Sequence, residues 1–144
     1  MGADIRVVAL GAVQRDDELL VFEGQSPDTE AAFYRSLGRR RRFGEHSSDA
    51  AVREFNEELG VTFTDPTDVG TFERVLSYDG DTAHETWRVY EGTLVEEWPY
   101  DRDAFTFVEP EFGTEHRACW LSIERLRADG TTFYTPEVLD AVSM

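Results

Sequence analysis

Only one segment of this chain combines all the features of an amphipathic helix, and strand-like segments precede and follow it. Ser47 or Ser48 can cap the free amides at its start, and Asp49 suits the positive end of a helix dipole. Gly60 suits the left-handed position after the last turn. Apolar side chains recur with the helical period and form a stripe that must pack on a core: Ala51, Val52, Phe55 and Leu59.

The other apolar segments have the pattern of β-strands separated by turns. Two hairpins are expected, one from strands at 5–13 and 18–23, and one from strands at 68–78 and 85–94. Residues 95–116 are polar and acidic and are predicted to form an irregular loop. Three shorter elements are also expected: an extended segment at 32–36, a buried strand at 117–123 and a short helix at 136–142. Strands on both sides of one helix predict an α+β or a layered α/β/α domain.

The composition favours one acidic, globular domain spanning 1–144. A chain of 144 residues with 40% apolar residues can build one hydrophobic core. Its 30 acidic residues outnumber 14 basic ones, all of which are Arg, and the net charge is -16. An acidic surface without lysine is typical of proteins that work in molar salt, where charges are screened over about 3 Å. We expect no binding to duplex nucleic acid or to a membrane, because both are anionic.

Several features indicate a cytoplasmic protein. The chain has one cysteine, Cys119, in an apolar segment that suggests a core position, so an intramolecular disulfide is excluded. The first residues lack the features of a signal peptide, and no segment reaches the ~20 apolar residues of a membrane span. The histidines have no metal-ligand spacing.

Three glutamates on the helix indicate a metal site. Glu54, Glu57 and Glu58 fall within an arc of about 100°, so their carboxylates repel one another unless cations lie among them. Mg²⁺ prefers such oxygen ligands. Arg53 lies one turn before Glu57 and can orient it, and Glu45 can brace Arg53. The alternative is a solvated acidic helix, but a chance match to the whole pattern has a frequency of roughly 10⁻⁵ to 10⁻⁴.

The segment from Glu45 to Val61 resembles the Nudix box, Gly-x5-Glu-x7-Arg-Glu-U-x-Glu-Glu-x-Gly-U with U apolar, and matches its second part in full. The resemblance implies a Nudix-type α/β/α sandwich with a mixed central sheet, and Mg²⁺ or Mn²⁺ as cofactor. It also implies roles for individual residues. The metal ligands would be Glu54, Glu57, Glu58 and the backbone carbonyl of Gly38. Glu54, or alternatively Glu115 in the expected loop, would activate the attacking water, with Arg53 assisting.

The first part of the box departs from the family, because Arg39 stands where the box has glycine and three more arginines follow it. Relatives typically read Gly-Gly-Gly-Val-Glu-Phe where this chain reads Gly38-Arg-Arg-Arg-Arg-Phe43. One inserted and one deleted G convert GC-rich codons of the first string into codons of the second, which suggests a compensated frameshift. The alternatives are a genuine clamp on substrate phosphates and a passive, exposed run.

The leading functional hypothesis is hydrolysis of a nucleoside diphosphate linked to another group, such as a nucleotide sugar or ADP-ribose. Nucleoside triphosphates are the alternative substrates, and a catalytically silent nucleotide-binding module is the alternative class. Tyr34 and Trp87 are candidates to stack a base and Arg39 to bind phosphate, although both aromatic residues also suit a packing role. Homodimers are common among relatives, so a homodimer is a possible partner state.

The frameshift hypothesis makes the first testable prediction. Resequencing the source DNA should return glycine, valine and glutamate codons at 39–42 if the arginine run arose in sequencing. A clean, unshifted read that encodes four arginines rejects that version of the hypothesis.

Overall fold

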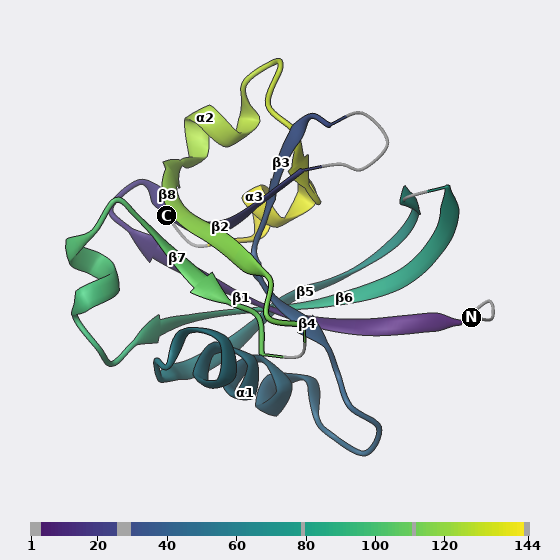
Figure 1. Cartoon of the computed structure of the whole chain (residues 1–144), viewed down its shortest axis with the longest axis horizontal. Helices are drawn as coiled ribbons and strands as arrows, with labels where there is room; N and C mark the ends of the chain where they lie inside the picture. Colours follow the sequence, from purple (N-terminus) through teal and green to yellow (C-terminus); the bar gives the residue numbers. More distant parts are fainter. Residues whose placement is uncertain (1–3, 26–29, 79, 111, 143–144) are drawn as a thin grey trace.

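The computed structural model describes residues 4–25, 30–78, 80–110 and 112–142, and it is organised around strand β1 (Ile5–Arg15), the purple strand of Figure 1. Side chains of β1 are buried alternately on its two faces. Val8 and Leu10 belong to one apolar cluster, and Ala9 and Val13 belong to another. The continuous apolar run of the sequence is therefore a central strand that is covered on both faces.

The sheet is mixed, and within the described residues it contains nine strands. Strand β1 runs parallel to β6 (Asp81–Leu94) and antiparallel to β4 (Leu37–Arg40). Strand β5 (Phe63–Tyr78) pairs with β6 at the edge, in a long hairpin that extends beyond the body of the molecule (Figure 1). The two predicted hairpins are present, although β5 begins five residues earlier than the expected 68–78 strand.

The second half of the sheet is built on β2 (Glu18–Gln25), which follows β1 through a tight turn. Strand β2 lies between β3 (Ala32–Arg35) and β8 (Glu115–Ser122) and is antiparallel to both. Strand β7 (Ala104–Val108) pairs with β8, and the short β9 (Phe133–Tyr134) runs parallel to β3. The expected extended segment at 32–36 and the buried strand at 117–123 are confirmed as β3 and β8.

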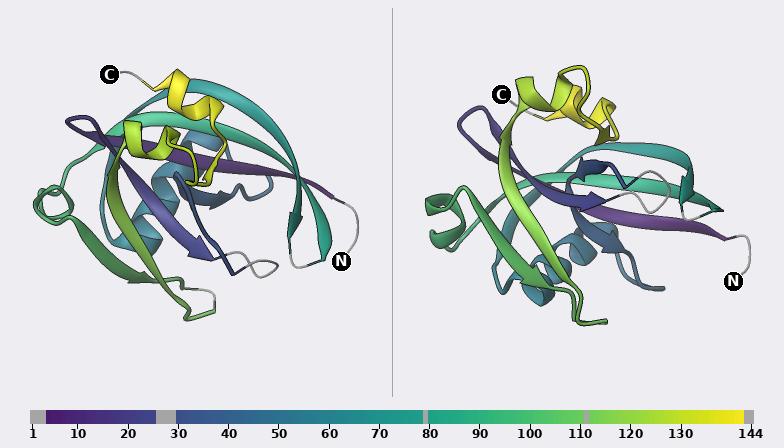
Figure 2. Two further views of the ribbon diagram at one scale, coloured as in Figure 1. Left: turned by 90° about the horizontal axis from the view of Figure 1, so that it is seen from above. Right: turned by 45° about the horizontal axis from the view of Figure 1, so that its top comes forward.

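Helices cover both faces of the sheet, as Figure 2 shows. Helix α1 (Ser47–Leu59) lies on one face, and α2 (Ile123–Arg127) and α3 (Glu137–Ala141) lie on the other. A single 3₁₀ turn, η1 (Trp98–Asp101), precedes β7. The expected layered sandwich with a mixed central sheet is confirmed. Among the described residues, no helix has both the length and the apolar composition that a membrane span requires.

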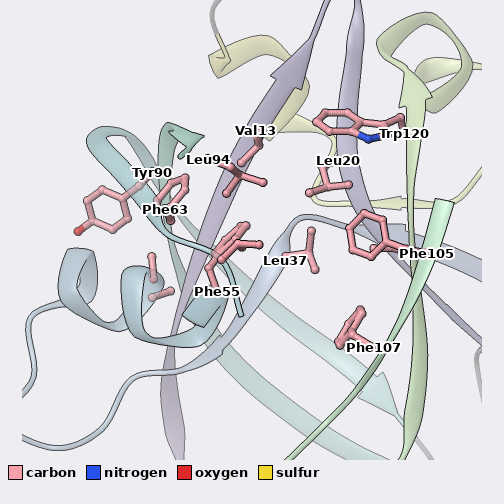
Figure 3. Packing of buried hydrophobic residues seen from close by; sticks show 14 of the residues in the cluster. Val13, Leu20, Leu37, Phe55, Phe63, Tyr90, Leu94, Phe105, Phe107 and Trp120 are labelled. Carbon is pink, nitrogen blue, oxygen red and sulfur yellow. The ribbon is translucent and has the colours of Figure 1, made fainter. Parts of the chain in front are cut away.

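The apolar cluster beneath α1 is shown in Figure 3. Phe55 points from the helix toward the sheet and stacks on Phe63, with 4.7 Å between ring centroids. Gly11 of β1 lies beneath this pair, and a Cβ atom there would approach Phe55 Cε1 to 2.5 Å. Glycine at this position therefore allows the helix to pack closely on the central strand. Cys119 is buried on the opposite face, as expected.

One prediction was wrong for much of its length: residues 95–116 are not an irregular loop. They contain η1, β7 and the start of β8. Phe105 and Phe107 are buried while Thr106 and Val108 are exposed, which is the alternation of a strand covered on one face. This short alternation was not recognised in the sequence, because acidic residues and prolines surround it. Helix α2 and strand β9 were also not predicted, and residue 79, between the two strands of the expected second hairpin, lies outside the described residues.

The helix prediction was correct in extent but wrong about its cap. Helix α1 ends as predicted at Gly60, whose φ of 68° is left-handed. His46 is the N-cap residue, however, and its side chain makes no capping hydrogen bond. Ser47 is already inside the first turn, where its buried hydroxyl has no hydrogen-bond partner in the described part of the chain. A side chain inside the first turn cannot cap the amides that a residue before the helix would reach.

We expect Gly11→Ala to destabilise the protein by about 1–3 kcal/mol, because the added methyl group overlaps the Phe55 ring. Urea denaturation measures the effect. Combining Gly11→Ala with Phe55→Leu should cost less than the sum of the two single changes, because the smaller side chain makes room for the methyl group. Strict additivity would contradict the packing described here.

Candidate functional site

The acidic face of α1 forms the floor of the candidate site. Glu54 is buried, the Glu58 side chain is 9% exposed, and the Glu57 side chain is 39% exposed. The apolar stripe of the same helix packs on the sheet, with Ala51 and Phe55 buried. The glutamates flank this stripe, so two of the three are drawn into the protein with it instead of pointing into solvent.

Arg53 organises the carboxylates around it. Its Nε and Nη2 atoms donate to the two oxygens of Glu45, at 2.7 and 2.9 Å. Its Nη1 atom donates to Glu54 Oε1 at 2.6 Å and to Glu57 Oε1 at 3.2 Å. The hydrogen bonds from Arg53 lower the pKa of Glu45 to about 2. Both contacts expected from the sequence, Arg53 with Glu57 and Glu45 with Arg53, are therefore present.

Of the three helix glutamates, Glu58 has the least favourable surroundings for a negative charge. Its Oε1 atom is buried and has no hydrogen-bond partner among the described residues. Burial, followed by a hydrogen bond with Glu54 and the negative charge of that residue, raises the pKa of Glu58 to about 8. Two adjacent buried carboxyl groups cannot both ionise at low cost unless a cation joins them.

A third buried carboxylate comes from another part of the chain. Glu109 follows β7 and is 4% exposed. Its Oε1 atom accepts from Arg39 Nη1 at 2.6 Å, and its Oε2 atom accepts from the backbone amide of Phe112 at 2.7 Å. Glu109 was not predicted as a site residue, because it falls in the segment that was expected to form a loop. One signal was present: Glu109 continues the period-two series of Phe105 and Phe107, which places it on their buried face.

Strand β4 accommodates Arg39 and Arg40 without a positive φ at either residue. Gly38 has a φ of 145°, and a Cβ atom there would collide with the carbonyl oxygen of Ala9 in β1. Arg39, where the Nudix box has glycine, has no positive φ. The carbonyl of Gly38, a predicted metal ligand, accepts from Arg35 Nη1 at 3.1 Å. Only Gly38 therefore requires glycine at this point of the strand.

Members of the arginine run differ in their surroundings. Arg39 pairs with Glu109, and its Nε atom lies 4.0 Å from Glu58 Oε1. Arg42 lies 3.4 Å from Glu57, and its backbone amide donates to Glu45 Oε1 at 3.1 Å. Arg40 is exposed. The run is therefore not uniformly passive, because two of its members contact glutamates of the site.

These groups line a cleft of about 1550 Å³. The α1 glutamates and Glu109 contribute acidic groups, and the arginine run contributes basic groups at the same opening. Further parts of its wall are formed by five aromatic side chains: Phe22, Phe33, Phe43, Phe107 and Phe112. Two of them, Phe43 and Phe112, are strongly exposed. The cleft thus joins groups that suit phosphate, cations and a flat ring.

The remaining predicted residues lie in different places. Trp87 is buried in the cluster beneath α2 and α3. Its Nε1 atom donates to Glu85 Oε1 at 2.8 Å, and the residue also lines the cleft. Tyr34 packs on the same cluster and does not line the cleft. Glu115, expected in a flexible loop, is exposed at the first position of β8. Its neighbours Thr114 and His116 line the cleft, so Glu115 lies on the other face of the strand.

The donor atoms suit a hard divalent ion, although the side chains are not gathered around one point. In the part of the chain that the structure describes, no three Asp, Glu, His or Cys side chains form a ready metal-binding group. The site carboxylates point instead toward Arg53, Arg42 and Arg39. The buried, unpartnered Oε1 of Glu58 beside Glu54 is nevertheless the kind of oxygen ligand that Mg²⁺ and Mn²⁺ take.

The fold is similar to that of several solved structures. A NUDIX hydrolase from Nitrosomonas europaea aligns over 96% of this chain and 86% of its own, with 23% identity and a TM-score of 0.66. A MutT NUDIX hydrolase from Burkholderia pseudomallei aligns over 97% of this chain and 99% of its own, with 20% identity and a TM-score of 0.70. An ADP compounds hydrolase aligns over 87% and 63%, with 19% identity and a TM-score of 0.63.

No protein-family model and no curated protein matches the sequence. At identities of 19–23% the structural likeness establishes the fold alone. The chain has the fold of the Nudix hydrolases.

The raised pKa of Glu58 predicts how stability changes with pH in EDTA. The folded state holds this proton up to about pH 8 and the unfolded chain only to about pH 4.5, so stability should fall as pH rises between these values. Glu58→Gln cannot ionise and should be more stable at pH 8.5, by on the order of 1–3 kcal/mol. Urea denaturation at pH 5.5 and 8.5 measures this. Equal pH dependence in the wild type and Glu58→Gln would contradict the assignment, and exposed Glu124→Gln serves as control.

Proposed function

We propose that this chain is a Nudix hydrolase that uses Mg²⁺ or Mn²⁺ to cleave the pyrophosphate bond of a nucleoside diphosphate linked to another group. The buried, unpartnered oxygen of Glu58 beside Glu54, at the floor of an arginine-lined cleft, is the observation that carries the proposal. Such a pair of carboxylates is unfavourable in a purely structural role and favourable when it binds a divalent ion.

In the proposed mechanism, Glu54, Glu57 and Glu58 hold the metal, with the carbonyl of Gly38 as a further ligand. A bound divalent ion supplies charge neutralisation at the diphosphate and acidifies a water molecule. Arg53 fixes the orientation of Glu54 and Glu57 through its hydrogen bonds, and Glu45 holds Arg53 in place. Gly60 ends the helix that carries the three glutamates and Arg53.

Glu54 is the proposed base that takes a proton from the attacking water. It is buried in the cleft, and its Oε1 atom is held by Arg53. Glu115 has less support, because it lies on the face of β8 away from the cleft-lining Thr114 and His116. Distance to the cleft decides between the two glutamates, since a general base must lie within hydrogen-bond distance of the water it deprotonates.

The cleft favours a substrate with two sizeable parts. At about 1550 Å³ it exceeds the roughly 300–1000 Å³ of common ligand pockets. The exposed rings of Phe43 and Phe112 are available to a base, and the arginines are available to phosphate. A nucleotide sugar or ADP-ribose fits this description, and one structural neighbour is an ADP compounds hydrolase. Nucleoside triphosphates are the second candidate, because another neighbour is described as a MutT NUDIX hydrolase.

We further propose that the protein works in a salt-rich cytoplasm, since a net charge of -16 without lysine is costly at low ionic strength. A homodimer remains a prediction.

Incubation of the purified protein with a panel of nucleotide derivatives and Mg²⁺ in molar KCl tests the proposal. We expect turnover that EDTA abolishes and that Glu54→Gln reduces about 10²- to 10⁴-fold, because the water loses its base. Glu124→Gln, on the exposed side of α2, is the matched control and should change turnover less than about twofold. Saturable binding of a nucleotide without turnover would instead support the binding-module alternative.

A further inference from the structure

Arg39 lies between two buried carboxylates that come from different elements. Its Nη1 atom is 2.6 Å from Glu109 Oε1, and its Nε atom is 4.0 Å from Glu58 Oε1. The Glu109 and Glu58 side chains are 6% and 9% exposed, whereas that of Arg39 is 33% exposed. The guanidinium group therefore covers both carboxylates from the cleft side.

The two carboxylates differ in the hydrogen-bond partners of their oxygens. Glu109 has a partner on each oxygen, because Arg39 donates to Oε1 and the Phe112 amide donates to Oε2. Arg39 lies too far from Glu58 Oε1 for a hydrogen bond, and that oxygen has no other partner among the described residues. Arg39 thus lies near Glu58 without occupying the lone pairs of this oxygen, so the oxygen can still accept a metal ion.

A divalent ion at Glu58 would lie close to the Arg39 charge, in a region screened only in part by water. Like charges at such separations repel strongly when they are partly buried. The same repulsion favours displacement of the guanidinium group, which is held at its other end by Glu109. The metal ion and Arg39 are therefore alternative positive partners for one carboxylate.

We infer that Arg39 is an internal counter-ion of the metal site, which competes with divalent ions for Glu58 and weakens their binding. The inference rests on the proposed metal-dependent function and adds a property of this chain, since the Nudix box has glycine at this position. Metal binding is then coupled to movement of the Arg39 guanidinium away from Glu58.

Arg40 provides a matched control. It is the next residue of β4, it carries the same charge, and it is exposed. Neighbouring residues of a strand point to opposite faces, so Arg39→Gln and Arg40→Gln remove the same formal charge from nearly the same place. A difference between the two variants reports the contact with the carboxylates and not the loss of net charge.

The test is titration of metal-free protein with Mn²⁺ alone, followed by calorimetry, without substrate. We expect Arg39→Gln to bind Mn²⁺ roughly tenfold more tightly than the wild type and Arg40→Gln to change affinity less than about twofold. In a Glu58→Gln background, Arg39→Gln should give no such gain, because the shared carboxylate is gone. Equal Mn²⁺ affinity in Arg39→Gln and Arg40→Gln would overturn the inference.

A second variant guards against failure to fold, because Arg39→Gln removes an ion pair from buried Glu109. Arg39→Gln/Glu109→Gln removes both charges and should also bind Mn²⁺ more tightly than the wild type. Wild-type binding that neither variant improves overturns the inference and leaves the proposed function standing. Absence of Mn²⁺ binding by the wild type and by every variant overturns both.

Discussion

The close packing of Phe55 over Gly11 holds helix α1 on the sheet and so positions the candidate site. It fixes α1 against the central strand β1, and the stacking of Phe55 on Phe63 extends the contact to β5. The glutamates flank this apolar stripe, so the depth of Phe55 sets how far Glu54 and Glu58 are drawn from water. Hydrophobic burial thus supplies the free energy that holds acidic groups where they are electrostatically unfavourable.

Charge compensation then determines how the acidic groups are arranged. Arg53 joins Glu45, Glu54 and Glu57 into one hydrogen-bonded group, and Arg39 joins Glu109 to the neighbourhood of Glu58. Such networks are stable only when almost every polar atom has a partner. The unpartnered oxygen of Glu58 is the exception, and an exception of this kind at the floor of a cleft is where a ligand is expected.

Strand β4 links the packed core of the sheet to the charged groups of the site. Its pairing with β1 requires glycine at position 38, where any side chain would meet the Ala9 carbonyl. The next residue alternates to the cleft side of the strand, which gives Arg39 access to Glu58 and Glu109. A substitution that breaks the box pattern is therefore tolerated by the backbone, and its consequences are electrostatic.

Features that depend on near neighbours along the chain could be predicted from the order of the amino acids. The extent of α1, its acidic arc, the two hairpins and the apolar central strand follow from periodicities of 3.6 and 2 residues. The burial of individual acidic groups and their cationic partners could not be predicted in this way, because both depend on the packing of distant segments. Arg39 and Glu109 are 70 positions apart, and β7 gains its buried face only by pairing with β8. Local patterns carry no information on such contacts, because they arise when distant segments are brought together by burial of their apolar faces.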